Sequence, residues 1–273
     1  MKLLVLSDLH NEFAEWEPPR DAVAQADIVV LAGDIHTGTA GISWALRHFS
    51  EKQIIYIAGN HEFYGGHWDK TLEELHRKAA EVGILFLEDE QVVLQGVRFL
   101  GCSLWTDFQY FGSGAAQQQA MNDYAAGLMD CRSIKARHPR KDGSHFTKHL
   151  TPLHVLKRHN NSRRWLESEL AEPFEGRTVV VTHHLPHRNS VAARYLDDRL
   201  TPGFAVELPI ETIAKADLWI HGHTHDSCTY KVTDPKNGSH ECLVICNPMG
   251  YPLSTGGVEN EQFDPHLLVE VGA

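Results

Sequence analysis

The 273-residue chain has an ordinary composition for a folded enzyme, with 42% hydrophobic and 22% charged residues. Its formal net charge of −11 argues against a protein whose whole surface binds nucleic acid. No apolar run approaches the length of a membrane-spanning helix. The five scattered cysteines contain no CxxC pair, so neither a zinc ribbon nor a disulfide framework is indicated. The nineteen histidines are the first indication of metal chemistry.

The chain begins with a predicted strand rather than a targeting segment. The apolar run at residues 3–6 is too short for a signal-peptide core, so we expect a cytoplasmic protein. Similar runs of β-branched and aliphatic residues predict five strands in all, at residues 2–6, 27–31, 53–57, 178–181 and 218–220. Because apolar residues occupy nearly every position of these runs, we expect both faces of each strand to be covered.

Helices and antiparallel strands are predicted between and after these runs. Leu72, Leu75 and Ala79 recur at helical spacing within residues 68–82, and Ser162 is suited to cap a second helix that runs to residue 170. The segments 91–104 and 227–246 alternate apolar and polar residues, and the second contains a turn at 234–238. We therefore expect an α/β (α+β) fold: a single domain over residues 1–273, with two stacked mixed sheets flanked by helices.

A basic insert is predicted at about residues 105–164. Its second half, residues 132–164, contains ten Lys and Arg residues and a single acidic residue, Asp142. Two interpretations are open. The insert either lies over the functional site and attracts an anionic substrate, or it is a solvated loop whose charge offsets an acidic body.

Side chains that bind metals follow each of the five predicted strands. In chain order they are Asp8, His10, Asp34, Asn60, His183, His223 and His225. Open α/β sheets hold ligands at the carboxyl ends of their strands, so we expect these side chains to meet. Oxygen and imidazole donors without a thiolate favour manganese, iron, zinc or cobalt in a reactive site over a structural zinc. Seven donors are too many for one ion with an open position, and they suit two ions that share a carboxylate.

The donors belong to five motifs: D-x-H at residue 8, G-D at 33, G-N-H-E at 59, T-H-H at 182 and G-H-T-H at 222. In this order the motifs resemble the calcineurin-like metallophosphoesterase superfamily, and in particular its bacterial small-substrate phosphohydrolases, including the cyclic-nucleotide phosphodiesterase branch. The segment after Asp34 lacks the Asp-Arg-Gly continuation of protein Ser/Thr phosphatases. The resemblance implies a four-layer α-β-β-α sandwich with a binuclear metal centre at the edge of the two sheets.

The resemblance also implies a role for each motif residue. Asp8, His10 and His225 would hold one ion, Asn60, His183 and His223 would hold the other, and Asp34 would bridge them. His61 matches the histidine that contacts the phosphoryl oxygen or protonates the leaving group, with Glu62 or another carboxylate orienting it. Candidate substrate contacts are His184, Asn122, Tyr124, His159 and Arg163. The loop at 247–252 is either a simple turn or a pocket wall.

The expected activity is that of a metal-dependent phosphoric ester hydrolase, either a phosphodiesterase or a phosphatase. A hydroxide that bridges two divalent ions (manganese, iron or zinc) would attack phosphorus in line. The expected partner is a small phosphorylated substrate, a phosphodiester such as a cyclic nucleotide or a small phosphomonoester, rather than nucleic acid or a membrane. The main alternative is a catalytically silent, metal-bound binding or scaffold protein of the same fold. A metallo-β-lactamase-like enzyme fits less well, because residues 221–226 carry its H-x-H-x-D-H residues in a different order.

Overall fold

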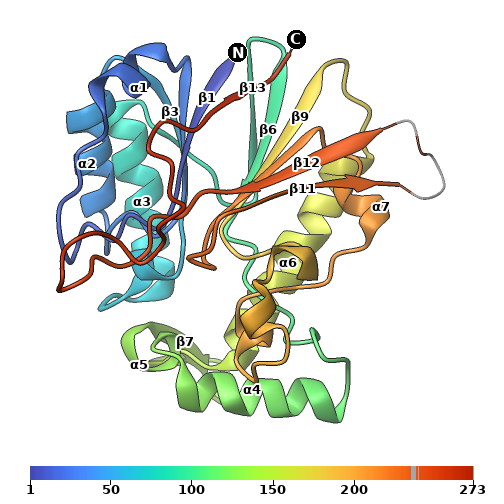
Figure 1. The fold of residues 1–273 in the computed structure, drawn as a ribbon. Helices are drawn as coiled ribbons and strands as arrows, with labels where there is room; N and C mark the ends of the chain where they lie inside the picture. Colours follow the sequence, from blue (N-terminus) through green and yellow to red (C-terminus); the bar gives the residue numbers. More distant parts are fainter. Residues whose placement is uncertain (235–237, 239, 273) are drawn as a thin grey trace.

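The predicted fold is confirmed by a computed structural model, which describes residues 1–234, 238 and 240–272 (Figure 1). The first sheet contains, in spatial order, β13 (Leu268–Glu270), β1 (Lys2–Leu6), β2 (Ile28–Ala32), β3 (Gln53–Ile57) and β4 (Leu85–Phe86). The second contains β11 (Cys228–Thr233), β12 (Glu241–Cys246), β10 (Leu218–His221), β9 (Arg177–Thr182), β6 (Val97–Cys102) and β5 (Glu90–Leu94). The inner strands of both sheets are parallel, whereas β13, β11 and β5 pair antiparallel with their neighbours.

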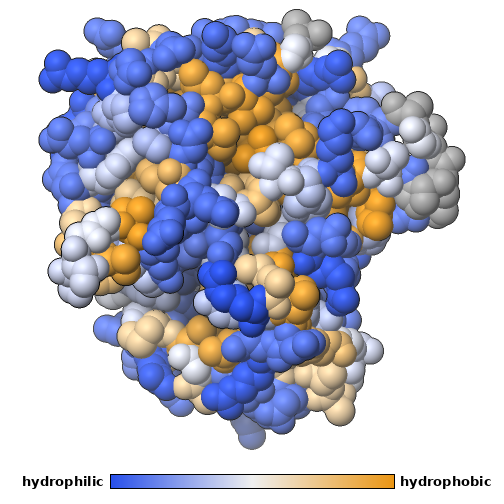
Figure 2. Space-filling model, in the orientation of Figure 1, coloured by the Kyte–Doolittle hydropathy of each residue, from blue (hydrophilic) through white to orange (hydrophobic). Residues whose placement is uncertain are grey.

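The apolar strands contribute alternate side chains to two different cores. In β1, Leu3 and Val5 belong to the core between the sheets, together with Val181 of β9. Leu4 and Leu6 of the same strand belong to the core beneath the helices. Both faces of the strand are therefore buried, which accounts for the uninterrupted apolar runs in the sequence. Hydrophobic surface in Figure 2 gathers where the two sheets meet, and mainly hydrophilic residues cover the helices of the first sheet.

Helices form the two outer layers of the sandwich. The first sheet is covered by α1 (Arg20–Gln25), α2 (Ala40–Phe49) and α3 (Trp68–Val82), and the second by α6 (Pro152–Ala171) and α7 (Ile210–Ile213) (Figure 1). Helix α3 has the predicted bounds. Helix α6 begins earlier than predicted, with proline at its first position and the His154 ring bonded back to Thr151. The prediction of Ser162 as an N-cap is therefore wrong: it is a buried residue in the middle of α6.

The predicted insert contains two helices and a hairpin that lie below the sandwich in Figure 1. The helices are α4 (Ala115–Gly127) and α5 (Asp130–Ser133), and the hairpin pairs β7 (Lys135–Pro139) with β8 (His145–His149). The chain returns to the second sheet through α6. Residues 235–237 of the predicted turn at 234–238 lie outside the described residues. In the part of the chain that the structure describes, no helix combines the length and apolar character needed to cross a membrane.

Candidate metal centre

The seven predicted donors lie where the carboxyl ends of strands from both sheets meet. The turns after β1, β2 and β3 of the first sheet carry Asp8, His10, Asp34 and Asn60, and those after β9 and β10 of the second carry His183, His223 and His225. The donors form groups whose ligand atoms lie within 4.8 Å of one another. The site therefore joins the two sheets at one edge.

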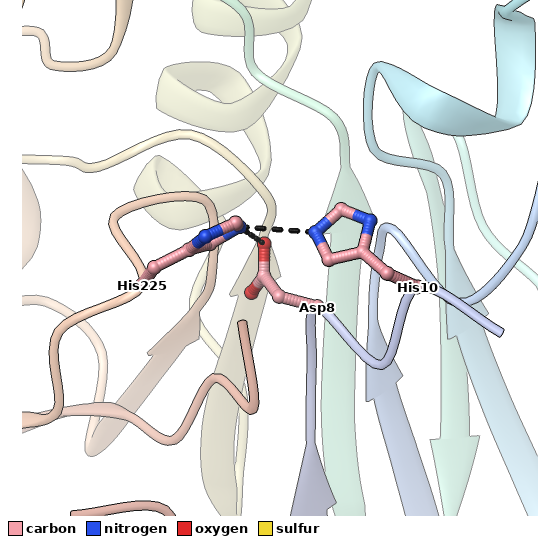
Figure 3. Close-up of side chains that lie close together, drawn as sticks. All are labelled: Asp8, His10 and His225. Carbon is pink, nitrogen blue, oxygen red and sulfur yellow. Dashed lines mark hydrogen bonds and ion pairs between the residues drawn. The ribbon is translucent and has the colours of Figure 1, made fainter. Parts of the chain in front are cut away.

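One group contains Asp8, His10 and His225 (Figure 3). The Nε2 atoms of His10 and His225 are 3.0 Å apart, and Nε2 of His225 lies 3.5 Å from Oδ1 of Asp8. Two imidazole nitrogens that face each other have one proton to share, and Asp8 adds a further acceptor beside them. The same three atoms are well suited to surround a cation.

The second group contains Asp34, His183 and His223, with Asn60 beside it. Nε2 of His183 lies 3.1 Å from Nδ1 of His223, 3.3 Å from Oδ1 of Asn60 and 3.4 Å from Oδ2 of Asp34. The same Asp34 oxygen is 4.0 Å from Nε2 of His10 in the first group. One carboxylate oxygen thus lies between the two groups, as a bridging ligand requires. The residues present fit a pair of divalent ions with mixed oxygen and nitrogen ligands.

Five of the donors have a left-handed backbone, which non-glycine residues rarely adopt. They are Asp8 (φ 51°), His10 (φ 45°), Asp34 (φ 54°), His223 (φ 71°) and His225 (φ 51°). Each such conformation costs about 1–3 kcal/mol, so it persists only where the surrounding structure enforces it. Five of the ten non-glycine residues with positive φ in the described part of the chain are thus residues that the sequence identified as donors.

Glycines beside the donors allow neighbouring turns to approach the carboxylates. A Cβ atom on Gly222 would lie 2.5 Å from Oδ2 of Asp8, and one on Gly59 would overlap Asp34. Without these atoms, the backbone N–H of His223 donates to Asp8 and that of His61 donates to Oδ1 of Asp34 at 2.8 Å. The second Asp34 oxygen remains directed at the two histidine groups.

Opposite charges dominate the electrostatics of the donors. Burial alone would raise the pKa of Asp34, but His183 and His61 outweigh it and hold this pKa well below its usual value. Burial would likewise lower the pKa of His183, yet Asp34 and Asp8 raise it to about 9. The pKa of His225 rises to about 10 against the effect of burial, because Asp8 and Glu259 accept its hydrogen bonds. Protons on these imidazoles occupy the place that divalent ions would take, so metal binding would release them.

His61 lies beside the donors and is oriented by Glu12. Its Nδ1 is 2.6 Å from Oε1 of Glu12, and its Nε2 is 3.2 Å from the hydroxyl of Tyr251. Burial lowers the pKa of His61, but Asp34 and Glu12 outweigh burial and raise it above its ordinary value. Glu12 was not singled out from the sequence, although it continues the alternate spacing of Asp8 and His10.

The sequence left open whether Glu62 or another carboxylate orients His61, and Glu62 has other partners. Its carboxylate accepts hydrogen bonds from the backbone N–H groups of Asp34, Ile35 and Gly59, at 2.7–3.0 Å, and from the Tyr56 hydroxyl. It therefore holds together the turns after β2 and β3, while Glu12 makes the contact with the imidazole of His61.

A buried carboxylate from the insert, Asp130, also reaches the centre. The Nδ2 of Asn60 donates to Asp130 at 3.0 Å, which leaves Oδ1 of the amide facing His183. The hydroxyls of Tyr64 and Tyr124 also donate to Asp130, at 2.7 Å and 2.5 Å. No local sequence pattern pointed to Asp130, because its contact with Asn60 spans 70 residues of chain.

A cavity of about 380 Å³ opens over the donors, and Tyr251 from the loop at 247–252 forms part of its wall. None of the five candidate substrate contacts lines it. His184 is buried behind His223, with ring centroids 4.2 Å apart, and Tyr124 reaches the centre only through Asp130. His159 is buried with Nδ1 3.1 Å from the Leu104 carbonyl. Arg163 pairs with Glu167 on α6, and Asn122 is exposed on α4.

Comparisons with known proteins agree with this geometry. A model of the calcineurin-like phosphoesterase family matches residues 1–227. Phosphopantetheinyl hydrolase (PptH) from Mycobacterium tuberculosis is similar in structure, with a TM-score of 0.60 and 16% sequence identity over 92% of this chain and 89% of that one. A dimetal phosphatase from Danio rerio gives a TM-score of 0.50 and 15% identity over 90% of this chain and 86% of that one. No curated protein sequence matches the chain.

Proposed function

The chain belongs to the calcineurin-like phosphoesterase family, and we propose that it hydrolyses a phosphodiester or a small phosphomonoester at a centre of two divalent metal ions. The observation that carries the proposal is the position of Asp34. One oxygen of this carboxylate faces a histidine group on each side, 3.4 Å from His183 and 4.0 Å from His10. This arrangement suits a ligand shared by two ions better than it suits a protein side chain in an ordinary core.

The donors would be divided between the two ions. Asp8, His10 and His225 would hold one ion, Asn60, His183 and His223 would hold the other, and Asp34 would contact both. When bound, such ions supply a water of lowered pKa as the nucleophile and neutralise charge on the phosphate. Manganese, iron and zinc are all compatible with this donor set.

His61 would supply the proton that the leaving oxygen needs. Its Nδ1 faces the Glu12 carboxylate, so the imidazolium can direct its second proton, on Nε2, into the cavity. The raised pKa of His61, due to Asp34 and Glu12 against the effect of burial, favours the protonated form that a general acid requires. General acid catalysis of this kind contributes roughly 10²–10⁴-fold to the rate.

The test combines metal analysis with turnover. We expect the purified protein to bind two equivalents of manganese or zinc and then to hydrolyse bis-p-nitrophenyl phosphate or p-nitrophenyl phosphate. His61→Ala should keep both metals and lose roughly 10²–10⁴-fold in kcat. Asp34→Asn should lose metal and activity together. His266→Ala, which removes a half-exposed histidine paired with Asp21, is the matched control and should retain both.

Two results would contradict the proposal. Full activity of Asp34→Asn would rule out a shared carboxylate at the reacting centre. A protein that binds both metals but hydrolyses no phosphate ester would instead be the silent metal-binding scaffold.

A further inference from the structure

One part of the cavity wall, beside the metal donors, is apolar. Its side chains come from the segment after α4 and from the loops between β9 and α7, and they are Leu128, Met129, Leu185, Val191, Leu200 and Phe204. The cavity volume of about 380 Å³ lies within the range of small-molecule sites, roughly 300–1,000 Å³. Hydrophobic walls with a few polar groups at one end are typical of sites that bind an organic group.

Contacts with His223, within the β9–α7 loops and between these loops and the end of α4 hold this wall in place. The ring of Phe204 stacks on the His223 imidazole, with centroids 4.6 Å apart, and the Phe204 carbonyl accepts a hydrogen bond from the Leu185 N–H at 3.2 Å. A Cβ atom on Gly127, at the end of α4, would lie 2.8 Å from the Leu200 side chain. The apolar surface is therefore packed against the donors themselves rather than carried on a separate loop.

Among the described residues, the cavity wall offers no guanidinium or ammonium group to a second anionic group on the substrate. Among the described residues that line it, none is Lys or Arg, whereas Asp130, Asp198 and Glu259 are acidic. Two arginines in the adjoining loop have close partners: Arg188 pairs with Glu207 at 2.6 Å and Arg194 with Asp226 at 2.7 Å. The third, Arg199, does not line the cavity, and its 75% exposed side chain lies 3.8 Å from Asp123. A carboxylate or second phosphate on the substrate would lose water here without gaining a guanidinium or ammonium counter-ion.

The basic residues of the insert face a different cavity. Arg137, Lys157 and Arg158 line a space of about 780 Å³ between α3, the β7–β8 hairpin and α6. None of the seven metal donors lines that space. None of the ten Lys and Arg residues at 132–164 lines the cavity beside the metal donors.

From these observations we infer that the substrate is a phosphate ester whose organic group is uncharged and apolar, aromatic or aliphatic, and lies against the wall formed by Leu128, Leu200 and Phe204. This inference rests on the proposed function, since it places the phosphate at the donors. Burial of the organic group would stabilise binding through the hydrophobic effect, while the phosphate carries the only negative charge. Sugar phosphates with further phosphates, and substrates with carboxylates, are excluded as preferred substrates.

A series of non-hydrolysable ligands tests the inference without relying on turnover. We would measure binding of methylphosphonate, phenylphosphonate and 4-carboxyphenylphosphonate to the manganese-loaded protein by calorimetry. Phenylphosphonate should bind about 10-fold or more tightly than methylphosphonate, and the added carboxylate should cancel most of this gain. In the same way, kcat/KM should be higher for phenyl p-nitrophenyl phosphate than for methyl p-nitrophenyl phosphate, which share a leaving group.

Met129→Lys places a cation on the cavity wall, at a position where the native side chain is 50% exposed. This variant should bind 4-carboxyphenylphosphonate more tightly than the wild type and phenylphosphonate less tightly. Val93→Lys makes the same change at a 52% exposed position on β5 and should alter neither affinity.

The outcomes separate the two ideas. Equal affinity for methyl- and phenylphosphonate in a protein that hydrolyses phosphate esters would overturn the inference alone. Preferred binding of phenylphosphonate in a metal-loaded protein without any hydrolysis would overturn the proposed function alone.

Discussion

At the scale of single residues, the contact between His61 and Glu12 determines which proton His61 can give up. A carboxylate 2.6 Å from Nδ1 stabilises the imidazolium and fixes its orientation, so that Nε2 faces the cavity. Burial acts in the opposite direction and by itself would lower the pKa of His61. Three acids, Asp34, Glu12 and Glu62, raise this pKa. Of these, Glu12 is the one whose carboxylate contacts the imidazole without being a proposed metal ligand.

Replacing Glu12 should therefore change the pH dependence of the reaction. In Glu12→Gln the pKa of His61 falls, because an attractive charge is lost while burial remains. A general acid is active while protonated and loses activity as pH rises through its pKa, so the alkaline limb of the kcat/KM profile should move to lower pH. The His61 titration can be followed directly by NMR in the metal-free protein.

Glu15→Gln removes an exposed carboxylate that pairs with Arg47 and is the control. An unchanged profile in Glu12→Gln would mean that Glu12 does not act through His61.

Residues that follow strands were predictable, and residues that reach the site through tertiary contacts were not. The donors from Asp8 to His225 each come directly after an apolar run, so position along the chain was enough to group them. Asp130 contacts Asn60 across 70 residues of chain, and nothing in its local sequence distinguishes it from a surface residue. Tyr251 contacts His61 across 190 residues, and it lies in the loop at 247–252, for which the sequence left open a turn or a pocket wall. His159 and Tyr124 were candidate substrate contacts because their side chains are able to bind a substrate. In the structure these side chains make buried hydrogen bonds within the protein instead.

At the scale of elements, strands and helices were predictable where burial gives a clear pattern. The bounds of β1, β3 and α3 agree with the predictions. The two strands are buried on both faces and therefore appear as uninterrupted apolar runs. The helix is buried on one side and therefore shows apolar residues three or four positions apart. The start of α6 was missed because only part of its length packs against the second sheet. Its first turn lies over the insert. There, an exposed Leu153 and nearby basic residues interrupt the helical spacing of buried apolar residues.

The short helix α5 links the insert to the proposed metal centre through Asp130. This carboxylate accepts hydrogen bonds from the amide nitrogen of Asn60 and from the Tyr64 hydroxyl, which is itself a second acceptor for that nitrogen. Asp130 thus helps to decide which end of the amide faces the ions. Asp130→Asn should weaken that preference and reduce the affinity for one of two metal ions by about 10–100-fold, as changes to groups that orient ligands typically do. Calorimetric titration with manganese would resolve one weakened and one unchanged site. Asp123→Asn, on α4, is the control. Equal affinities in Asp130→Asn and the native protein would show that Asn60 needs no such support.

At the scale of the whole molecule, the proposed ions would connect the two sheets. The first sheet supplies Asp8, His10, Asp34 and Asn60, and the second supplies His183, His223 and His225. Five of these seven residues have strained backbones, and their carboxylates and imidazoles are held close together by opposite charge. An ion in each group would satisfy ligands from both sheets at once. The unfolded chain cannot present this arrangement, so metal binding would add to the stability of the folded state.

Removal of metal should therefore lower the stability of the whole fold rather than affect the site alone. An ion present at 100 times its Kd adds about 2.7 kcal/mol to the free energy of unfolding. For a chain of this size such a change corresponds to roughly 5–10 °C in Tm, and two ions would give more. We expect chelation to lower Tm by at least this amount and added manganese or zinc to restore it, as measured by calorimetry. In Asp34→Asn, which lacks the shared ligand, chelation should have a much smaller effect. A native protein with the same Tm before and after chelation would show that ions do not hold the two sheets together.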